Sequence, residues 1–474
     1  METPTQTLHR LTSYEPGREW DVPMDDPRLL QDVEANDIDR LPWFFKRYGG
    51  SLPQVPLPRE LPPTSASAVA VLAGTARVDL AELDLPRLSL LLYLSAGVVR
   101  TSERPYGTYL FRAAGSAGGR FPVELYVAVP ESGAAPPGVH WYHPLDHALV
   151  QVGPPPRGDA PALVVTGIPW RTGWRYRERG FRHVYWDAGT MLAQTLAVAA
   201  AAGLRPRLFS RFPDEEIAGL VGADRVHELP VAVVSLGDGE PALEKTGPAT
   251  EGAVDAAPVE SPLVTLAQRA GERDDLGPPW ESGDPINADA KSDPVETVVL
   301  TRGSQRRMDP ARSLPQPLLC DSLAVALRGI DLPHFVVVHA VDGLEPGVYR
   351  WPDLTAPVRA GDLRDELYRV CLDQALGRDA AFVVIAAANV AALDDHQYRE
   401  AQLAAGIVEG RLHLLAYALG ASASGMTFMD CEIPALLGEP LDALLFTCVG
   451  VPEYASAPGG PPGAPRSVSK IEPR

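Results

Sequence analysis

The sequence RAAGSAGG at positions 112–119 leads directly into the apolar run FPVELYVAV at positions 121–129. A second unusual stretch, RGSQRR at positions 302–307, follows the apolar residues 298–300. The first stretch offers small side chains and a permissive backbone, whereas the second offers cations and a hydroxyl group. Each half of the chain has one of these pieces and lacks the other. We therefore expect the two halves to share one composite site.

Other landmarks recur in the same order in both halves. They are PGV at 137–139 and 346–348, AG at 188–189 and 405–406, and the β-like runs 231–237 and 444–450. The first pair precedes aromatic residues, and the second pair lies in Ala-rich helical stretches. Such recurrence indicates a duplication. The alternative is chance repetition of Pro-Gly turns and Ala-rich helices.

The repetition predicts two tandem domains, and strands separated by long helices indicate an α/β or α+β layered fold for each. We place an N-terminal extension at 1–60, the first domain at 61–237, an acidic Pro/Gly/Ala-rich linker at 238–293, the second domain at 294–454 and a basic C-terminal tail at 455–474. The linker shows little apolar periodicity. We expect it to be partly disordered and to contribute little packing.

Apolar periodicity predicts the same order of elements in each half. In the first half we expect a helix at 85–97, strands at 123–129 and 162–166, a helix from 186 and a strand at 231–236. In the second half we expect a helix at 318–327, strands at 335–341 and 382–386, a helix at 398–419 and a strand at 444–449.

Composition restricts the classes of function. The net charge of −19 over 474 residues argues against nucleic-acid binding, which recruits clustered cations. The four cysteines show no CxxC spacing, so we expect free thiols and no metal site. The apolar run 188–204 is shorter than a bilayer requires. With no apolar leader at the N-terminus, we expect a cytoplasmic protein without membrane contact.

The paired stretches at 112–119 and 302–307 resemble the cofactor site of the nitroreductase-like flavoproteins, in which FMN lies at a dimer interface. The segments 8–14, 42–48 and 52–58 further resemble the N-terminal extension of the SagB-type dehydrogenases, which oxidise azolines in ribosomal-peptide natural-product pathways. Together the resemblances cover most of the chain outside the linker. They imply an α+β fold of two tandem nitroreductase-like domains, each a central mixed or antiparallel sheet with flanking long helices. The domains would form an intramolecular pseudo-dimer, with FMN as cofactor.

By this resemblance, Arg302, Ser304 and Arg306 form the phosphate end of the FMN site. Their alternate positions project to one side of an extended segment, and guanidinium groups form charge-assisted bonds with phosphate. Arg466 and Lys470 of the tail are additional cations for this site. The alternative interpretation is a solvated basic turn in an Arg-rich protein.

The resemblance places the flavin ring beside two further segments. Those segments contribute Ser116, Ala117 and Gly118 as close neighbours, Arg112 as a positive charge, and Gly425, Met426 and Thr427 as sources of backbone donors. The small residues suit close approach by a flat ring. The alternative for the first segment is a Gly-rich hairpin turn.

Positions 170–183 read WRTGWRYRERGFRH, where azoline dehydrogenases have Lys-Tyr followed by Gly-x-Arg-Gly-Tyr-Arg. Oxidising an azoline requires a base for the Cα proton, and arginine cannot serve because it stays protonated. We expect Arg175 to lower the pKa of Tyr176 and leave its phenolate as the base. The alternative is an Arg-rich surface loop.

The leading hypothesis is an FMN-dependent dehydrogenase that oxidises an azoline or a related peptide-derived substrate, with dioxygen as final acceptor, beside other enzymes of a peptide-modifying complex. A second hypothesis is a reductase of an activated alkene, imine or nitro group that uses NAD(P)H. A third is a flavin-free scaffold or binding subunit, because each half lacks one of the two cofactor-binding pieces. A flavin spectrum of the purified protein separates the third from the others.

Overall fold

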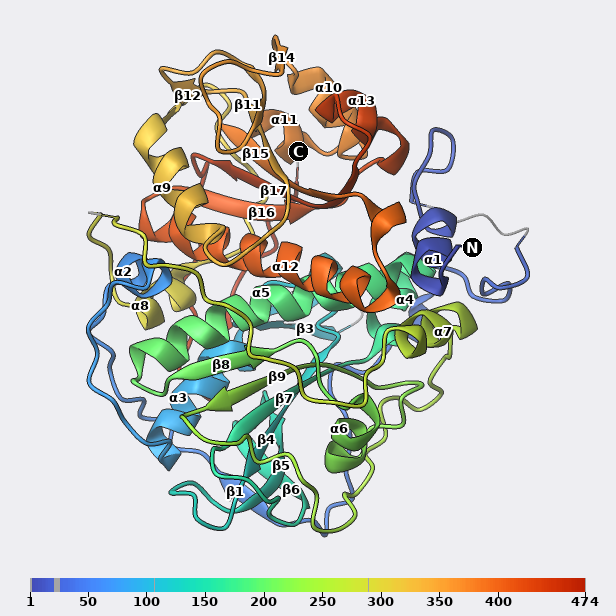
Figure 1. Ribbon diagram of the computed structural model, residues 1–474, viewed down its shortest axis with the longest axis vertical. Helices are drawn as coiled ribbons and strands as arrows, with labels where there is room; N and C mark the ends of the chain where they lie inside the picture. Colours follow the sequence, from blue (N-terminus) through green and yellow to red (C-terminus); the bar gives the residue numbers. More distant parts are fainter. Residues whose placement is uncertain (1, 21–25, 106, 289, 474) are drawn as a thin grey trace.

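The computed structural model describes residues 2–20, 26–105, 107–288 and 290–473. Its helices are α1 Pro4–Leu11, α2 Ala68–Ala73, α3 Leu85–Ala96, α4 Pro169–Tyr176, α5 Gly180–Ala201, α6 Asp214–Val221, α7 Pro262–Ala270, α8 Val295–Thr301, α9 Gln316–Ala326, α10 Arg364–Val370, α11 Ala375–Asp379, α12 Asp395–Ala418 and α13 Ile433–Leu437. The chain folds into two domains, drawn one above the other in Figure 1.

Each domain is built on an antiparallel sheet. The first sheet has the order β1 Gln54–Pro56, β6 Ala148–Gly153, β5 Gly138–His143, β4 Val123–Val129, β7 Ala162–Gly167, β9 Leu229–Leu236 and β8 Pro206–Phe209. The second has the order β14 Arg359–Ala360, β13 Gly347–Arg350, β11 His334–Val338, β15 Phe382–Ala388, β17 Asp442–Gly450 and β16 Ser422–Met426. From β5 to β8 and from β13 to β16 the orders correspond strand for strand. The fold is therefore α+β with two tandem domains of one topology.

Two small sheets complete the structure. One pairs β10 Leu314–Pro315 with β12 Val341–Asp342 in parallel. The other joins β18 Arg466–Ser467 of the C-terminal tail to β2 Val98–Arg104, which pairs with β3 Gly107–Arg112. The tail is thus attached to the first domain, beside the Gly-rich stretch that follows β3.

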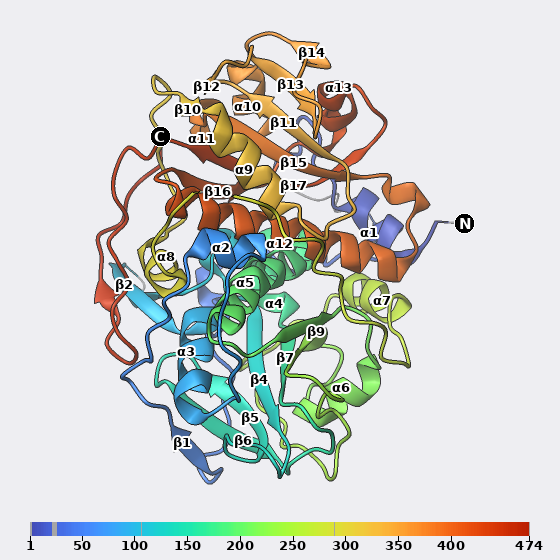
Figure 2. The same cartoon turned by 60° about the vertical axis from the view of Figure 1, so that its left-hand side comes forward.

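The two long helices α5 and α12 pack against each other between the domains (Figures 1 and 2). Glycines allow the backbones to approach closely, because a Cβ atom on Gly189 would lie 2.4 Å from the carbonyl oxygen of Leu403. A Cβ atom on Gly406 would lie 2.4 Å from the oxygen of Trp186. The repeated Ala-Gly pairs in the sequence are therefore the contact points of the pseudo-dimer.

Most predicted elements lie where the sequence indicated. One difference concerns the stretch at 170–183, which forms α4, the short 3₁₀ helix η3 Arg177–Arg179 and the start of α5. Its side chains are largely buried, including Arg171 and Arg179. The alternative interpretation of this stretch as an Arg-rich surface loop is therefore wrong.

The expectation of a disordered linker with little packing is also wrong. Helix α7 lies within positions 238–293 and packs against α1 and α12, with Leu263, Val264 and Ala267 buried. The hydroxyl of Tyr185 donates to Gln268 Oε1 at 2.6 Å. The apolar spacing of α7 forms one helical face, which the surrounding Pro- and Gly-rich composition obscured.

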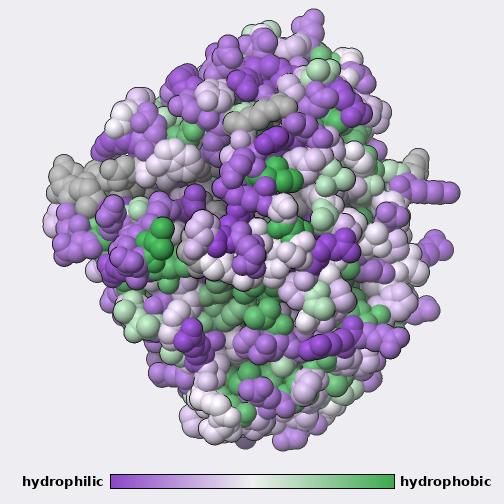
Figure 3. All heavy atoms as spheres, turned by 180° about the vertical axis from the view of Figure 1, so that it is seen from behind, coloured by the Kyte–Doolittle hydropathy of each residue, from purple (hydrophilic) through white to green (hydrophobic). Residues whose placement is uncertain are grey.

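On the face opposite to that of Figure 1, hydrophilic residues cover most of the second domain, and apolar residues gather near the middle of the molecule (Figure 3). Within the described part of the chain, none of the helices combines the length and apolar character needed to span a bilayer.

Candidate functional site

The Gly-rich stretch at 112–119 and the basic stretch at 302–307 meet between the domains. Helix α8 ends at Arg302, whose buried side chain extends into the first domain. Its Nη2 donates to the carbonyl oxygen of Ala113, and its Nε donates to Gln194 Oε1 at 3.3 Å. Its Nη1 has no hydrogen-bond partner among the described residues. This contact between the two halves is the candidate composite site, in which one buried donor of Arg302 lacks a partner among the described residues.

The Gly-rich stretch borders this arginine directly. A Cβ atom on Gly115 would lie 3.6 Å from Arg302 Nη1 and 3.7 Å from both Ser304 Oγ and His413 Cε1. The side chains of Ser304 and Arg306 are exposed. Arg302 and Ser304 of the predicted phosphate end therefore lie beside the first-domain stretch, and Arg306 is open to solvent.

The C-terminal tail adds cations to the same region. Arg466 pairs in register with Arg100, a residue that the sequence analysis missed. Arg100 donates from Nη2 to the carbonyl oxygens of Leu300 at 2.7 Å and Arg302 at 3.0 Å. Burial, with the charges of Arg302 and Arg466 as further causes, lowers the pKa of Arg100 to about 10. Arg100 belongs to no recognisable sequence motif, so its place beside Arg302 becomes evident only in the fold.

Lys470 lies further out on the tail, where it forms an ion pair with Glu472. The pKa of Glu472 is lowered mainly by its hydrogen bond with Lys470, and the charge of Arg306 contributes. Lys470 and Arg306 thus both act electrostatically on the same carboxylate, that of Glu472. Arg474, the last basic residue of the tail, is outside the described residues.

Strand β16 supplies the second-domain wall. Gly425 faces α12, and a Cβ atom there would lie 2.9 Å from Glu409 Oε1. Met426 is buried, whereas the Oγ1 of Thr427 accepts a hydrogen bond from Arg179 Nη2 at 3.4 Å. Of this predicted trio, Gly425 is the member that lies beside Glu409 of α12.

The charged centre between α5 and α12 was missed at the sequence level. Thr190 of α5 donates to Glu409 Oε2, and His413 Nδ1 lies 3.5 Å from Glu409 Oε1. Burial lowers the pKa of His413, so this ring is neutral at physiological pH. Glu409 and His413 lie four residues apart on α12, and the packing of the domains brings Arg302 close to Glu409 as a neighbouring cation.

Asp187 of α5 is a buried carboxyl group whose pKa is shifted toward neutral pH. Its Oδ2 accepts from Ser116 Oγ at 2.5 Å, and its Oδ1 accepts from the backbone N–H of Ala117 at 2.9 Å. Burial raises its pKa to about 7, with repulsion from Glu409 adding to the rise and the two hydrogen bonds opposing it. Two predicted residues, Ser116 and Ala117, thus act by holding a carboxyl group that the sequence analysis overlooked.

Tyr176 and Arg175 also border the Gly-rich stretch. A Cβ atom on Gly118 would lie 2.7 Å from both the Tyr176 hydroxyl and Arg175 Cδ. Burial raises the pKa of Tyr176 to about 12, an effect larger than the opposing charge of Arg175. The charge of Arg175 thus acts in the expected direction, but burial outweighs it and favours the protonated phenol.

Arg112 is directed away from the composite site, contrary to the expectation that its charge serves the flavin. Its Nη1 donates to the oxygen of Val123 at 2.5 Å, and its Nη2 donates to that of Phe44 at 2.8 Å and lies 3.7 Å from Glu124 Oε1. Burial lowers the pKa of Arg112 to about 10, although Glu124 opposes this effect. The last residue of β3 points inward, where it helps to neutralise a buried carboxylate.

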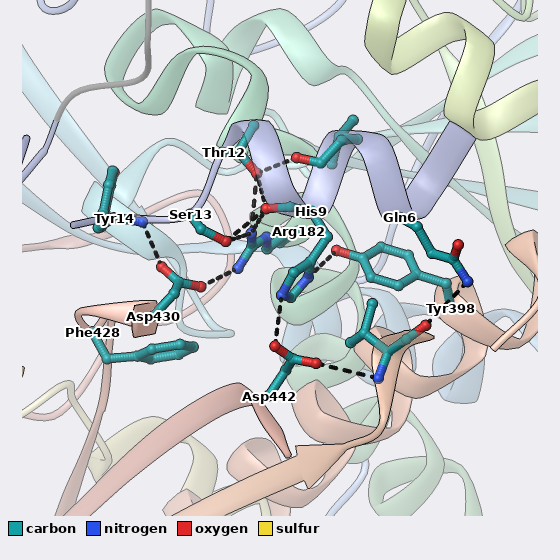
Figure 4. Close-up of polar contacts among 12 residues, drawn as sticks. Gln6, His9, Thr12, Ser13, Tyr14, Arg182, Tyr398, Phe428, Asp430 and Asp442 are labelled. Carbon is teal, nitrogen blue, oxygen red and sulfur yellow. Dashed lines mark hydrogen bonds and ion pairs between the residues drawn. The ribbon is translucent and has the colours of Figure 1, made fainter. Parts of the chain in front are cut away.

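Arg179 and Arg182 of the 170–183 stretch hold the N-terminal extension. Arg182 Nη1 donates to Asp430 Oδ1 at 2.7 Å, and its Nη2 donates to the oxygen of His9 at 2.7 Å (Figure 4). Arg179 Nη1 donates to Asp430 Oδ2 at 2.6 Å and to the oxygen of Thr12 at 2.7 Å. The backbone N–H of Tyr14 donates to the same carboxylate at 2.8 Å. This motif thus links α1, α5 and the second domain.

FMN requires cations at its phosphate, and close backbone approach at its ring. The composite site offers the exposed Ser304 and Arg306, the unused Nη1 of Arg302, and small residues at Gly115 and Gly425. The donor set and these small residues fit the cofactor. For a metal ion, by contrast, the described residues contain no group of three or more suitable His, Cys, Asp or Glu ligands.

Comparisons with known proteins agree with this topology. The chain is similar to a solved structure from Anabaena variabilis, provisionally named a nitroreductase, with 22% identity and a TM-score of 0.68 over 96% of this chain and 100% of that one. It is also similar to a protein of Methanocaldococcus jannaschii, provisionally named a nitroreductase, with 28% identity over 170 residues, which are 33% of this chain and 81% of that protein. No family model matches the chain. The fold is nitroreductase-like across both domains.

Proposed function

We propose that the chain is an FMN-dependent oxidoreductase that binds one FMN between its two domains. The observation that carries this proposal is the position of Arg302, which belongs to the second domain but contacts Ala113 of the first. Its buried Nη1 lacks a partner among the described residues, and an anionic oxygen of the cofactor would provide one. Bound FMN would supply a hydride acceptor.

The chain's own residues then divide into binding and proton-handling groups. Ser304 and Arg306 would hold the phosphate, with Arg466 and Lys470 adding positive charge from the tail. Gly115 would leave space beside the ring because it carries no side chain. These assignments make one half of the chain the phosphate holder and the other half the ring neighbour.

Asp187 would move the proton. A carboxyl group with a pKa of about 7 exchanges protons readily at neutral pH, which suits a general base. Its Oδ2 is fixed by Ser116 Oγ and its Oδ1 by the N–H of Ala117, so it is held against the ring-flanking stretch. Tyr176, protonated and adjacent to Gly118, would serve as a hydrogen-bond donor to the substrate.

For the substrate we propose an azoline or a related peptide-derived compound, with dioxygen as the final acceptor and other enzymes of a biosynthetic complex as partners. The Arg-Tyr pair at 175–176 and the arginines at 177–182 support this choice through their resemblance to SagB-type dehydrogenases. In such a reaction a proton leaves Cα of the azoline ring, and the Asp187 carboxylate would accept it.

Cofactor stoichiometry tests the composite site. We expect one FMN per chain after denaturation and quantitation of the released flavin against protein. Two FMN molecules per chain would contradict a single composite site, and a colourless protein that does not bind added FMN would favour a flavin-free scaffold.

Anaerobic stopped-flow reduction with a synthetic azoline peptide tests the proton transfer. Asp187→Asn should retain FMN and slow flavin bleaching by roughly 10²–10⁴-fold, the usual scale for loss of a general base. Tyr176→Phe, the matched control, should slow it by about tenfold, because one neutral hydrogen bond is worth about 0.5–1.5 kcal/mol. A larger effect at Tyr176 than at Asp187 would reverse the two roles. Bleaching by NAD(P)H and no bleaching by the azoline would indicate a reductase.

A further inference from the structure

A second cavity, of about 350 Å³, lies between the two domains. Its apolar wall comes from the facing helices and includes Ala193, Leu196, Ala200 and Ile407. Residues after α2 form another side. This volume falls within the range of small-molecule sites, which are typically apolar clefts with a few polar groups.

The tandem topology relates this cavity to the composite site. Helix α2 corresponds to α8, since α2 precedes α3 in the first domain as α8 precedes α9 in the second. Counted from the ends of these helices, Gly74 takes the place of Arg302, Ala76 that of Ser304 and Val78 that of Arg306. Gly74, Ala76 and Val78 all line the second cavity. It is therefore the pseudo-symmetric counterpart of the first site, without the side chains that would hold a flavin phosphate.

Three arginines line the second cavity. Arg205 of the first domain forms an ion pair with Asp238, whereas Arg328 and Arg411 come from the second domain. Arg411 Nη1 donates to the oxygens of Ala326 at 3.0 Å and Arg328 at 2.6 Å, and Arg328 Nε donates to that of Leu72 at 3.2 Å. These bonds fix the guanidinium groups at one end of the apolar wall.

The positive charge at this end is not neutralised by the protein. Among the residues that the structure describes, neither Arg328 nor Arg411 forms an ion pair with a carboxylate, and Glu281 at the rim is exposed. Burial, with repulsion from Arg328 as a second cause, lowers the pKa of Arg411 to about 10. A bound anion would relieve both effects, because a desolvated charge is stabilised by a close partner of opposite sign.

The chain at 280–286 closes the outer side. The backbone N–H of Trp280 donates to the oxygen of Leu208 at 2.6 Å, and its indole Nε1 donates to that of Gly329 at 3.0 Å. The N–H of Ile286 donates to the oxygen of Ala73 at 2.9 Å. Figure 1 shows the chain between α7 and α8 crossing in front of α5 and α12. This segment bridges the two domains and makes the groove between them a cavity.

We propose that this second cavity binds a small amphipathic anion. Its apolar body would pack on α5 beside Leu196 and Ala200, and its anionic group would contact Arg411 and Arg328. The site is separate from the composite site and its occupation does not depend on flavin. After duplication, the composite site would thus have kept the proposed cofactor, and the second cavity would have become able to bind a different ligand.

Isothermal titration of the full-length protein with octanoate tests the proposal, with octyl phosphate to compare head groups and 1-octanol as the neutral control. We expect 1:1 binding of octanoate or octyl phosphate, at least tenfold tighter than octanol, with the flavin spectrum unchanged. The stronger of the two anions identifies the head group. Equal binding of octanol, or displacement of bound flavin, would overturn the proposal.

Variants locate the site. Arg411→Gln should weaken anion binding at least tenfold, whereas Arg411→Lys should remain within a few fold, because a charge-assisted contact is about twice as strong as a neutral one. Ala200→Phe should fill the cavity and abolish binding while leaving both arginines in place. Unchanged binding in either Arg411→Gln or Ala200→Phe would overturn the assignment. Arg77→Gln, an exposed cation near α2, is the control and should bind as the native protein does.

Discussion

The two sites between the domains take the cations discussed above from different elements of the second domain. In the composite site the second domain contributes Arg302 and Arg306 at the end of α8, and the first domain contributes small residues. In the second cavity the equivalent positions Gly74 and Val78 carry no charge, and Arg328 enters from the opposite domain. A homodimer must keep its two sites identical, because one sequence forms both. A fused pair of domains is free of this constraint, so its two sites can diverge.

The largest expected effect would come from removing the cations of the composite site. Arg302→Ala combined with Arg306→Ala should raise the Kd for FMN by roughly 10²–10⁴-fold, because each charge-assisted contact contributes about 1.5–3 kcal/mol and 1.4 kcal/mol corresponds to tenfold. Titration of flavin fluorescence measures this change. Arg77→Ala, near the equivalent end of α2, is the matched control and should leave the Kd unchanged. Equal losses in both variants would remove the asymmetry between the two sites.

This asymmetry was visible in the sequence, because the basic stretch and the Gly-rich stretch occur once each in opposite halves. The order of strands and long helices followed from apolar periodicity, which reports directly on buried faces. The helix at 262–270 was missed because flanking Pro and Gly residues dominated its composition. Asp187 and Arg100 were missed for another reason. Their neighbours are distant in sequence, and one-dimensional patterns do not show which isolated charges become buried together.

Arg112 is part of the 112–119 stretch, but its side chain is directed away from the composite site. Its substitution should therefore change the stability of the fold and not the affinity for FMN. Arg112→Ala should lower the free energy of unfolding by about 3–5 kcal/mol, the usual cost of removing one partner of a buried ion pair. Glu124 would keep Arg171 Nη1 at 2.5 Å and Trp141 Nε1 at 2.8 Å, so the fold should persist. Urea unfolding measures the loss, and the Kd for FMN should stay within about twofold. A stable variant with weak FMN binding would return Arg112 to the composite site.

The segment that closes the second cavity follows α7 in the chain. The packing of α7 should therefore help to hold this segment in place, and variants of α7 test that packing. Leu263→Ala should cost about 2–3 kcal/mol of stability, since a buried leucine is lost near the surface. Leu266 of the same helix is 53% exposed, and Leu266→Ala should change stability by less than about 0.5 kcal/mol. Thermal and urea unfolding of the two variants provide the comparison. Equal small effects would mean that α7 contributes no packing.

The smallest expected effects concern the pKa of Asp187, which groups of the two domains shift in opposite directions. The Ser116 hydroxyl of the first domain donates to the carboxylate and lowers its pKa, whereas Glu409 of the second domain raises it by repulsion. Ser116→Ala should therefore raise the pKa of Asp187 above about 7, and Glu409→Gln should lower it, each by roughly one unit, because one unit corresponds to about 1.4 kcal/mol.

The pH dependence of unfolding measures these shifts without any substrate. The folded pKa of Asp187, about 7, lies above the ordinary value of 3.8, so between these values the folded state keeps a proton that the unfolded state has lost. The contribution of Asp187 to stability therefore falls as the pH rises through this window and becomes constant above the folded pKa. Each variant is compared with the same variant carrying Asp187→Asn, which isolates this contribution. The plateau should begin at higher pH in Ser116→Ala and at lower pH in Glu409→Gln. A shift in the same direction in both would show that the two domains do not act on Asp187 in opposition.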